Sequence, residues 1–444
     1  MKLSSLNQLA SLIGIETKQK VAITGVAVDT RLVSPGDIFI ALPGEKADGH
    51  QFLEEAAKKG ASCFLLNKNY KGSCFGLPAL YTEDPLFSLQ LLAKKVLEKS
   101  HAKIVAITGS VGKTTTKDFL TTLLQEKYVV AKTPGNANSQ IGLPLAILNH
   151  TDGKEDVLVL EMGMNAKGHI EKLVEIAPPD IAVLTHVGLA HAASFDSLLE
   201  IAKEKAQIFK HPKTKIAILN GDMEHLDVIM QIGTCEKLLF SVACKQTGFY
   251  LDNFTLHTSK DGFFRLDPSL HPFFGKHHYQ NLLAACAVAC HLGLSFEEIK
   301  RAEAKLSLPE KRFEVKEISG ITFINDSYNA SESSLIAALE ALPKPKKGGR
   351  VIAVIGEMLE LGKFSKACHE RVGKKALVHA DLCFLFGKEC KPIYSLWKEN
   401  KKPVKWFLGL GELRKALKAQ VFASDVVLLK GSSANQLWTV LEEF

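Results

Sequence analysis

Cysteine is sparse in this sequence and is not arranged as a framework. The chain has 9 cysteines in 444 residues, an odd number with no C-x-x-C pair. Disulfide-stapled domains and zinc sites need cysteines that recur in close, paired spacings. The sequence therefore argues against both a disulfide framework and a zinc site.

Long hydrophobic runs are also missing. No stretch approaches the roughly 20 apolar residues that a membrane-spanning helix needs. The first segment, MKLSSLNQLASLIG, contains one lysine and polar interruptions, and no small-residue cleavage site follows it. This pattern predicts a first helix rather than a signal peptide. We therefore expect a cytoplasmic protein with no membrane span.

The basic stripes that bind nucleic acids are absent as well. The net charge of +7 is modest and spread along the chain, and aromatic residues make up only 8% of it. Such a charge suits anionic small substrates at least as well as nucleic acid, so no nucleic-acid partner is expected. A chain of 444 residues is too long for one core and predicts about two to four domains.

The sequence is organised around residues 104–120, which read IVAITGSVGKTTTKDFL. The apolar start predicts a short buried strand, Gly109 and Gly112 allow a tight turn, and an amphipathic helix follows. Such a turn directs backbone N–H groups and a helix dipole at one point, which suits a phosphate. Lys113 would reach the terminal phosphates, and a threonine hydroxyl after it would hold Mg²⁺. The first glycine of the standard pattern is missing, and an exposed helix start without a ligand is the alternative.

Polar side chains follow two further apolar strands. Residues 157–163 predict a buried strand that delivers Glu161 at its carboxyl end, and a strand from residue 181 is followed by His186 and His191. Ligands of open parallel sheets bind outside the carboxyl ends of the strands, so an acid here can bind magnesium. An acid that caps a strand end, or a structural histidine, is the alternative.

The first unit carries a cluster of turn motifs between short predicted strands. D-T-R occupies residues 29–31, P-G-D residues 35–37, L-P-G residues 42–44 and D-G-H residues 48–50. A carboxylate, a guanidinium and exposed backbone could contact a phosphate or a uracil. A purely structural cap is the alternative.

The last unit alternates strands with helices, as a Rossmann-like parallel sheet does. Arg312 follows a polar linker, and Asp326, Tyr328 and Asn329 lie at the carboxyl end of a predicted strand. A helix-capping turn is the alternative for these polar residues. No G-x-G-x-x-G follows the first strand, so a dinucleotide cofactor is not expected. We expect domains at residues 1–84, 85–308 and 309–444.

These motifs together resemble the Mur ligase family. T-G-S-V-G-K-T-T is similar to the ATP loop of Mur ligases and folylpolyglutamate synthases, and D-T-R with P-G-D is similar to the UDP-binding domain of the later Mur ligases. H-x-x-N, D-S-Y-N-A and G-E-M-L-E-L-G continue the resemblance in family order. The tetrapeptide D-N-P-R of the diamino-acid-adding member is absent, which favours the dipeptide-adding member.

The resemblance implies both a fold and an activity. The fold is α/β with a small UDP-binding domain, a central phosphate-loop ATPase domain with a mostly parallel sheet, and a C-terminal Rossmann-like domain. The activity is ATP-dependent joining of D-alanyl-D-alanine to UDP-N-acetylmuramoyl-tripeptide through an acyl phosphate, in peptidoglycan synthesis. ATP and two Mg²⁺ ions are the implied cofactors, and a monomer is the implied state.

The resemblance also implies site residues. The catalytic residues are Lys113, Lys205 and His191. The ATP-binding residues are Gly109, Ser110, Val111, Gly112, Lys113, Thr114, Thr115, Asn281, Arg312, Asp326, Tyr328 and Asn329. The UDP-substrate residues are Asp29, Thr30, Arg31, Gly44, His50, Asn136 and Asn138, although the two asparagines could only cap turns. The metal ligands are Thr114, Glu161, His191 and a carbamylated Lys205.

The carbamate on Lys205, formed with CO₂, has a chemical rationale. Lys205 lies in residues 197–209, which predict an amphipathic helix whose lysines could otherwise be an ordinary solvated face. A bare ammonium would be repelled by Mg²⁺, whereas a carbamate is an anion with two hard oxygen ligands. The pattern alone leaves the choice open.

Five positions depart from the family pattern. Ser433 replaces an arginine, Gln207 a glutamate and His278 an asparagine; Ala193 stands where an acid is common, and the glycine before Arg312 is missing. These departures keep open a degenerate binding protein with the same fold. A folylpolyglutamate synthase is the enzyme alternative, although that family lacks the D-T-R domain.

Overall fold

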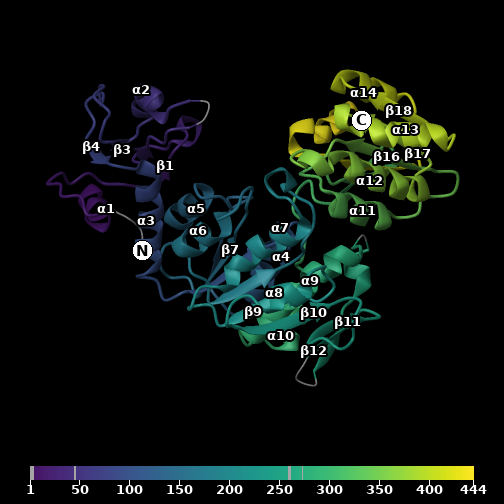
Figure 1. Cartoon of the computed structure of the whole chain (residues 1–444), viewed down its shortest axis with the longest axis horizontal. Helices are drawn as coiled ribbons and strands as arrows, with labels where there is room; N and C mark the ends of the chain where they lie inside the picture. Colours follow the sequence, from purple (N-terminus) through teal and green to yellow (C-terminus); the bar gives the residue numbers. More distant parts are fainter. Residues whose placement is uncertain (1–4, 45–46, 259–261, 273) are drawn as a thin grey trace.

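The computed structural model describes residues 5–44, 47–258, 262–272 and 274–444. In this part of the chain the strands form three separate sheets of four, nine and six strands. Figure 1 shows the N-terminal and C-terminal units at opposite ends of the molecule, with the nine-stranded unit between them. The predicted three-domain α/β fold is confirmed. The limits at residues 84/85 and 308/309 stay predictions.

The N-terminal sheet is parallel, with the strand order β1-β2-β3-β4. Its strands are β1 (Val26–Ala27), β2 (Ile38–Ile40), β3 (Cys63–Asn67) and β4 (Ala79–Thr82). Its helical segments are α1 (Leu6–Leu12), η1 (Thr30–Leu32), η2 (Gly49–Phe52) and α2 (Leu53–Lys58). The predicted first helix is observed, although residues 1–4 of its sequence lie outside the described residues. Strand β4 was not predicted, because only Leu80 within it is buried.

The central sheet is parallel from β6 to β11 and antiparallel from β11 to β13, in the order β13-β12-β11-β10-β9-β8-β5-β7-β6. Its strands are β5 (Lys103–Thr108), β6 (Val130–Lys132), β7 (Val157–Glu161), β8 (Ile181–Leu184), β9 (Ile216–Asn220), β10 (Glu236–Ser241), β11 (Phe249–Asp252), β12 (Thr255–Thr258) and β13 (Phe263–Arg265). Its helical segments are α3 (Pro85–Leu97), α4 (Lys113–Leu124), α5 (Gly142–His150), α6 (His169–Ile176), η3 (Ala192–Ser194), α7 (Leu198–Lys205), η4 (Ala206–Phe209), α8 (Leu226–Met230), η5 (Pro268–Leu270), α9 (Lys276–His291) and α10 (Phe296–Glu303).

Strand β5 lies between β7 and β8 and is covered on both faces, which explains its nearly uniform apolar sequence. Val105 and Ile107 pack in the core that includes α4 and α9, whereas Ile104 and Ala106 pack in the core on the other face. This alternation follows from the two-residue period of a strand. The core therefore fixes the strand end from which the phosphate loop departs.

One predicted helix is shorter than expected. Residues 197–209 were expected to form one helix, but α7 ends at Lys205 and a 3-10 turn, η4, follows. Ser197 caps α7 by accepting a bond from the Glu200 amide. Lys205 is therefore the last residue of the α-helix.

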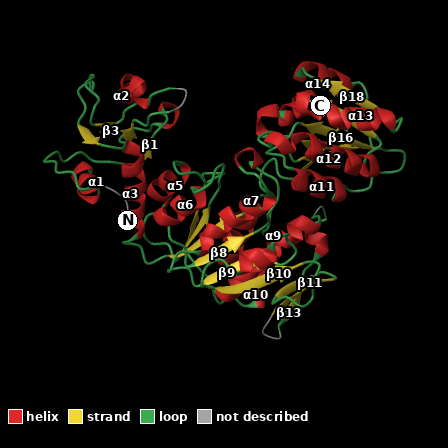
Figure 2. Cartoon of the chain, in the orientation of Figure 1, coloured by secondary structure: helices red, strands yellow, loops and turns green. Residues whose placement is uncertain are grey.

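The C-terminal sheet has the order β14-β15-β19-β16-β17-β18 and is parallel except for β14. Its strands are β14 (Glu314–Ile318), β15 (Ile321–Asn325), β16 (Val351–Gly356), β17 (Leu382–Phe386), β18 (Val404–Phe407) and β19 (Val426–Lys430). Its helical segments are α11 (Glu332–Glu340), η6 (Gly362–Phe364), α12 (Ser365–His379), η7 (Lys388–Cys390), α13 (Lys391–Glu399), α14 (Leu410–Lys418), η8 (Ser433–Asn435) and η9 (Leu437–Glu443). Figure 2 shows the alternation of helix and strand in this unit. Across the described residues, none of the helices combines the length and apolar character needed to cross a bilayer.

Candidate active site

The phosphate loop joins β5 to α4 and is held by its neighbours. Gly112 precedes α4 with a φ of 86°, in the left-handed region that glycine adopts without strain. A Cβ there would lie 2.3 Å from the Asn281 side-chain oxygen, so a larger residue would also force the Asn281 side chain to move. The Ser110 hydroxyl donates to the Gly188 carbonyl at 2.7 Å, and the Thr185 hydroxyl donates to the Val111 carbonyl at 2.6 Å. The loop conformation is therefore fixed before any ligand binds.

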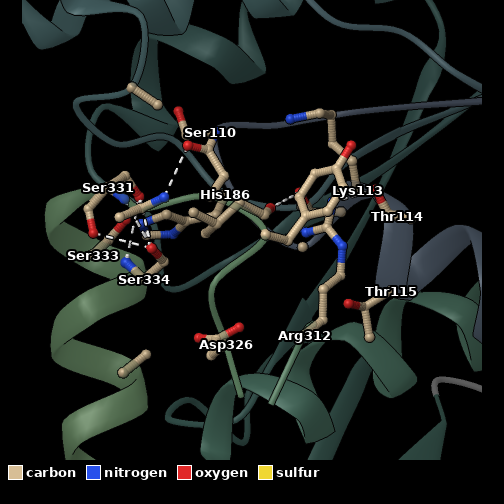
Figure 3. Close-up of a pocket in the computed structure, with 18 of the residues that line it drawn as sticks. Ser110, Lys113, Thr114, Thr115, His186, Arg312, Asp326, Ser331, Ser333 and Ser334 are labelled. Atoms are coloured by element: carbon tan, nitrogen blue, oxygen red, sulfur yellow. Dashed lines mark hydrogen bonds between the residues drawn. The ribbon is translucent and has the colours of Figure 1, made fainter. Parts of the chain in front are cut away.

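A cavity of about 530 Å³ opens beside this loop, between the central and C-terminal domains. Its volume is in the range of small-molecule sites. In Figure 3 the serines at the start of α11 face one side of the cavity, and Lys113 and Thr114 lie on the other. The predicted ATP residues that line it are Ser110, Val111, Gly112, Lys113, Thr114, Thr115, Asn281, Arg312, Asp326, Tyr328 and Asn329. Gly109 is the one predicted ATP residue outside the lining; its carbonyl accepts a bond from Lys113 Nζ at 2.8 Å.

Glu161, at the end of β7, is the centre of a buried polar network. Its carboxylate accepts from the Thr114 hydroxyl at 2.8 Å and from the Asn138 amide at 2.7 Å. The Lys117 ammonium lies 3.6 Å from Glu161 Oε2 and donates to the Gly135 carbonyl at 2.6 Å. The network therefore ties the phosphate helix, the strand end and the asparagine loop together.

Replacing Lys117 with methionine is expected to destabilise the fold. Lys117 and Glu161 are both 1% exposed, and removing one partner of a buried pair costs about 3 kcal/mol because the other charge stays buried. Urea unfolding of the two proteins measures the change. Lys132→Met is the matched control, since Lys132 forms a partly exposed pair with Asp118 and should lose less than about 1 kcal/mol. Equal losses in both variants would contradict the role of burial.

Lys205 is buried, and the carboxylate that acts on it through space is that of its chain neighbour Glu204. Its residue is 2% exposed, and among the described residues none forms a hydrogen bond or ion pair with its ammonium. Burial, and secondly the charge of Lys113, place the pKa of Lys205 well below its ordinary value. Burial also lowers the pKa of Lys113. Lys205 does not itself line the cavity.

The two histidines after β8, His186 and His191, both line the cavity. Burial lowers the pKa of both rings. His191 pairs through Nδ1 with the Glu360 carboxylate of the C-terminal domain. Both histidines therefore lie at the predicted crevice, and His191 contacts the opposite domain.

The C-terminal domain contributes a guanidinium and a buried ion pair. The Arg312 guanidinium donates to the Thr114 hydroxyl at 2.9 Å and lies 4.2 Å from the centre of the Tyr328 ring. Lys430 is 2% exposed and lies 2.7 Å from the Asp326 carboxylate. Its ammonium also donates to the Asn329 carbonyl at 2.9 Å. Arg312 and Asp326 are therefore fixed at the domain boundary.

The segment that connects the two domains has an unusual backbone. Lys311 occupies the position of the missing family glycine, and its φ is 58°. Its ammonium lies 4.1 Å from the centre of the Trp438 ring, and its carbonyl accepts from the Tyr328 amide at 3.1 Å. The left-handed conformation explains why glycine is common there, and these contacts hold the lysine in it.

The predicted UDP residues of the first domain lie outside this cavity. Arg31 Nε donates to the Asp29 carboxylate at 2.9 Å, and this bond lowers the pKa of Asp29. His50 Nδ1 lies 2.6 Å from Asp48, and its ring stacks on Tyr70 with centres 4.9 Å apart. Thr30 is buried, and the Gly44 amide donates to the Ala47 carbonyl at 3.1 Å. Asn136 and Asn138, predicted with them, line the cavity instead.

Two departures from the family pattern are explained by local contacts. His278 accepts from the Gly275 amide at 3.0 Å, so the ring supplies a cap at the start of α9. Gln207, in the 3-10 turn η4, donates to the Lys203 carbonyl of α7 at 2.9 Å. Ser433 lines the cavity, and nothing in the structure explains why it replaces an arginine.

Sequence reasoning missed several lining or supporting residues. Lys117 was detectable, because it follows Lys113 by one helical turn and so lies on the same face. No sequence pattern, apart from the motifs that contain them, indicated that the cavity is also lined by Glu360, Lys430 and the three serines at the start of α11. Their positions depend on how the two domains meet.

Three family models match the chain. They are the Mur ligase middle domain over residues 107–289, the Mur ligase glutamate ligase domain over 311–433, and the Mur ligase family catalytic domain over 22–73. A Bacillus subtilis protein named UDP-N-acetylmuramoyl-tripeptide--D-alanyl-D-alanine ligase is 32% identical, with 96% of this chain and 94% of that protein covered. The Escherichia coli protein of the same name is 33% identical over 84% of this chain and 83% of its own length.

Solved structures show the same likeness. MurF from Acinetobacter baumannii matches with a TM-score of 0.87 at 25% identity, covering 99% of this chain and 98% of that one. MurF from Thermotoga maritima in complex with ADP matches with a TM-score of 0.79 at 31% identity, covering 95% and 96%. E. coli FolC matches with a TM-score of 0.61 at 20% identity over 80% of this chain and 91% of that one, which shows a shared fold alone.

Proposed function

Because this chain belongs to the Mur ligase family, we propose that it joins D-alanyl-D-alanine to UDP-N-acetylmuramoyl-tripeptide with ATP cleaved to ADP and phosphate. The observation that carries the proposal is the cavity in which a phosphate loop, Glu161 and residues of the C-terminal domain meet. Relatives named UDP-N-acetylmuramoyl-tripeptide--D-alanyl-D-alanine ligase match along nearly the whole chain. Peptidoglycan synthesis is then the process that this chain serves.

The cavity fits a two-step chemistry. A carboxylate oxygen of the tripeptide attacks the γ-phosphorus of ATP, an O–P bond forms, and the bond to ADP breaks. The dipeptide amine then attacks the acyl carbon, loses a proton, and displaces phosphate. The Lys113 ammonium and the Arg312 guanidinium lie beside the phosphate loop. There they would stabilise the negative charge that develops on the oxygens of the transferred phosphoryl group.

Residues at the cavity fit magnesium, the ion that phosphoryl transfer requires. Thr114 and Glu161 offer a hydroxyl and a carboxylate in contact with each other, and hard oxygens are the ligands that Mg²⁺ prefers. Within the described ranges no three His, Cys, Asp or Glu side chains gather as a ready metal cluster, so ATP phosphates and water would complete the shell. When bound, the ion neutralises phosphate charge.

We propose that Lys205 is carbamylated. Its pKa, lowered by burial, favours the neutral amine, whose lone pair attacks CO₂ to form an N–C bond with loss of a proton. The resulting anion would place negative charge near Lys113 and so remove the repulsion between the two ammonium groups. His191 would share metal binding with the carbamate.

We propose that the UDP end of the substrate binds the first domain through Asp29, Thr30, Arg31, Gly44 and His50, whose side chains and backbone include hydrogen-bonding and charged groups. Asn136 and Asn138 lie at the cavity, where the reacting carboxylate belongs. ATP and UDP-linked precursors are cytoplasmic compounds, so we place the reaction there. We propose that the protein acts as a monomer, with domains close to residues 1–84, 85–308 and 309–444.

Phosphate release from ATP tests this function. Purified protein with Mg²⁺ is given UDP-N-acetylmuramoyl-tripeptide and D-alanyl-D-alanine, with each omitted in turn, and the product mass is measured. We expect release only when both are present. A folate substrate with glutamate is the control for the related ligases. Phosphate release with the folate substrate and glutamate would refute the proposed function. The absence of release with every combination of substrates would refute it as well.

A further inference from the structure

The central and C-terminal domains touch at a small surface beside the cavity, formed by η3 and η6 with their flanking residues. The Ala193 amide donates to the Glu360 carbonyl at 2.9 Å, and a Cβ on Gly362 would lie 3.1 Å from Ala193 Cα. Lys363 Nζ lies 2.9 Å from Asp196 Oδ1. The contact therefore combines a main-chain bond, close packing and an ion pair.

His191 and Glu360 meet at the centre of this surface. His191 Nδ1 contacts the Glu360 carboxylate, and both residues have left-handed backbones, with φ of 54° and 62°. Such a backbone is costly for a residue other than glycine and is retained where surrounding contacts fix it. The neighbouring main-chain bond between residues 193 and 360 supplies that fixation.

A histidine that binds a metal through one ring nitrogen commonly donates its other N–H to a carboxylate, which selects the tautomer and holds the ring. Glu360 contacts Nδ1, so Nε2 keeps the free lone pair. We propose that Glu360 is a positioning residue which prepares His191 for magnesium, so that the ligand set of the central domain is completed only when the C-terminal domain is docked. This inference rests on the proposed function.

The simpler explanation is an ordinary surface ion pair. The Glu360 side chain is 61% exposed and that of His191 34%, and exposed pairs contribute little to stability. The Lys363 and Asp196 side chains, 58% and 81% exposed, form such a pair across the same surface without a contact to His191. Asp196→Asn is therefore a matched control for Glu360→Gln.

The first experiment uses the ligand-free protein. The ¹⁵N shifts of the histidine rings are measured by NMR in the wild type, Glu360→Gln and Asp196→Asn, with His191→Gln used to assign the signal. We expect the Nδ1-protonated tautomer of His191 in the wild type and in Asp196→Asn, and a mixed population in Glu360→Gln. An unchanged tautomer in Glu360→Gln would overturn the proposal.

The second experiment measures Mn²⁺ affinity of the ADP complex by EPR in the same proteins. We expect Glu360→Gln to weaken Mn²⁺ by about tenfold, as loss of a carboxylate behind a ligating histidine does. Asp196→Asn should stay within about twofold of the wild type. Equal affinity in all three, or equal loss in both variants, would overturn the proposal. Neither measurement depends on the protein catalysing peptide-bond formation. The phosphate-release experiment on the wild type tests that function separately.

Discussion

Replacing Lys113 with alanine is expected to lower ATP-dependent product formation by about a thousandfold or more, the loss typical of removing a group that stabilises developing charge. Lys113 is the cation at the start of α4 that reaches into the cavity, and no other lysine lines the loop side of it among the described residues. Product formation is followed by mass spectrometry with both substrates and ATP present.

The fold should survive this replacement. The Lys113 ammonium donates a hydrogen bond to the Gly109 carbonyl, and its charge lowers the pKa of the buried Lys205, so removing it takes away a repulsion. Circular dichroism and thermal unfolding check that the variant is folded, and Lys95→Ala on α3, a partly exposed position away from the cavity, serves as the control. Retained activity in folded Lys113→Ala would refute the assignment of the phosphate loop.

Lys205→Ala is expected to be inactive and to regain part of its activity when a small carboxylate such as formate or acetate is added. Alanine removes the nitrogen that would carry the carbamate and leaves space for a free anion at the same place. The measurement is product formation against carboxylate concentration at a fixed Mg²⁺ concentration. Rescue by carboxylate is specific to a missing anion, because a misfolded variant would not respond to it.

Lys203→Ala is the matched control, since Lys203 lies on the same helix but is exposed. It should keep full activity and show no response to added carboxylate. Full activity of Lys205→Ala would remove Lys205 from the site. An inactive, folded Lys205→Ala that no carboxylate rescues would refute the carbamate while leaving Lys205 as a required residue.

The buried strands and the phosphate loop could be predicted because their signals are local. β5, β7 and β8 are covered on both faces, so they appear as apolar runs, and the polar residues after them lie at one sheet edge. The glycines of the loop are set by backbone conformation and close approach, which act over a few residues. Sequence pattern was therefore enough to place Lys113 and Glu161.

Other parts of the fold carry weaker local signals. β6 has no fully buried residue and β14 has none either, so neither has the apolar run or the strict alternation of a half-buried strand. Glu360 and Lys430 reach the cavity only because two domains meet, and a pairing between residues 191 and 360 has no sequence signature. Tertiary contact, which local pattern does not encode, decides these positions.

The lysine in the interdomain connection affects how freely the two domains move. A glycine at residue 311 would sample both signs of φ, whereas a left-handed L-residue lies about 1 kcal/mol or more above its relaxed state. Contacts from Trp438 and Tyr328 hold Lys311 in one backbone state. The connection therefore has a preferred angle, and less conformational entropy would be lost when ATP binds at the proposed site between the domains. Reopening for product release then requires the connection to leave that angle, which makes release a candidate for the slow step.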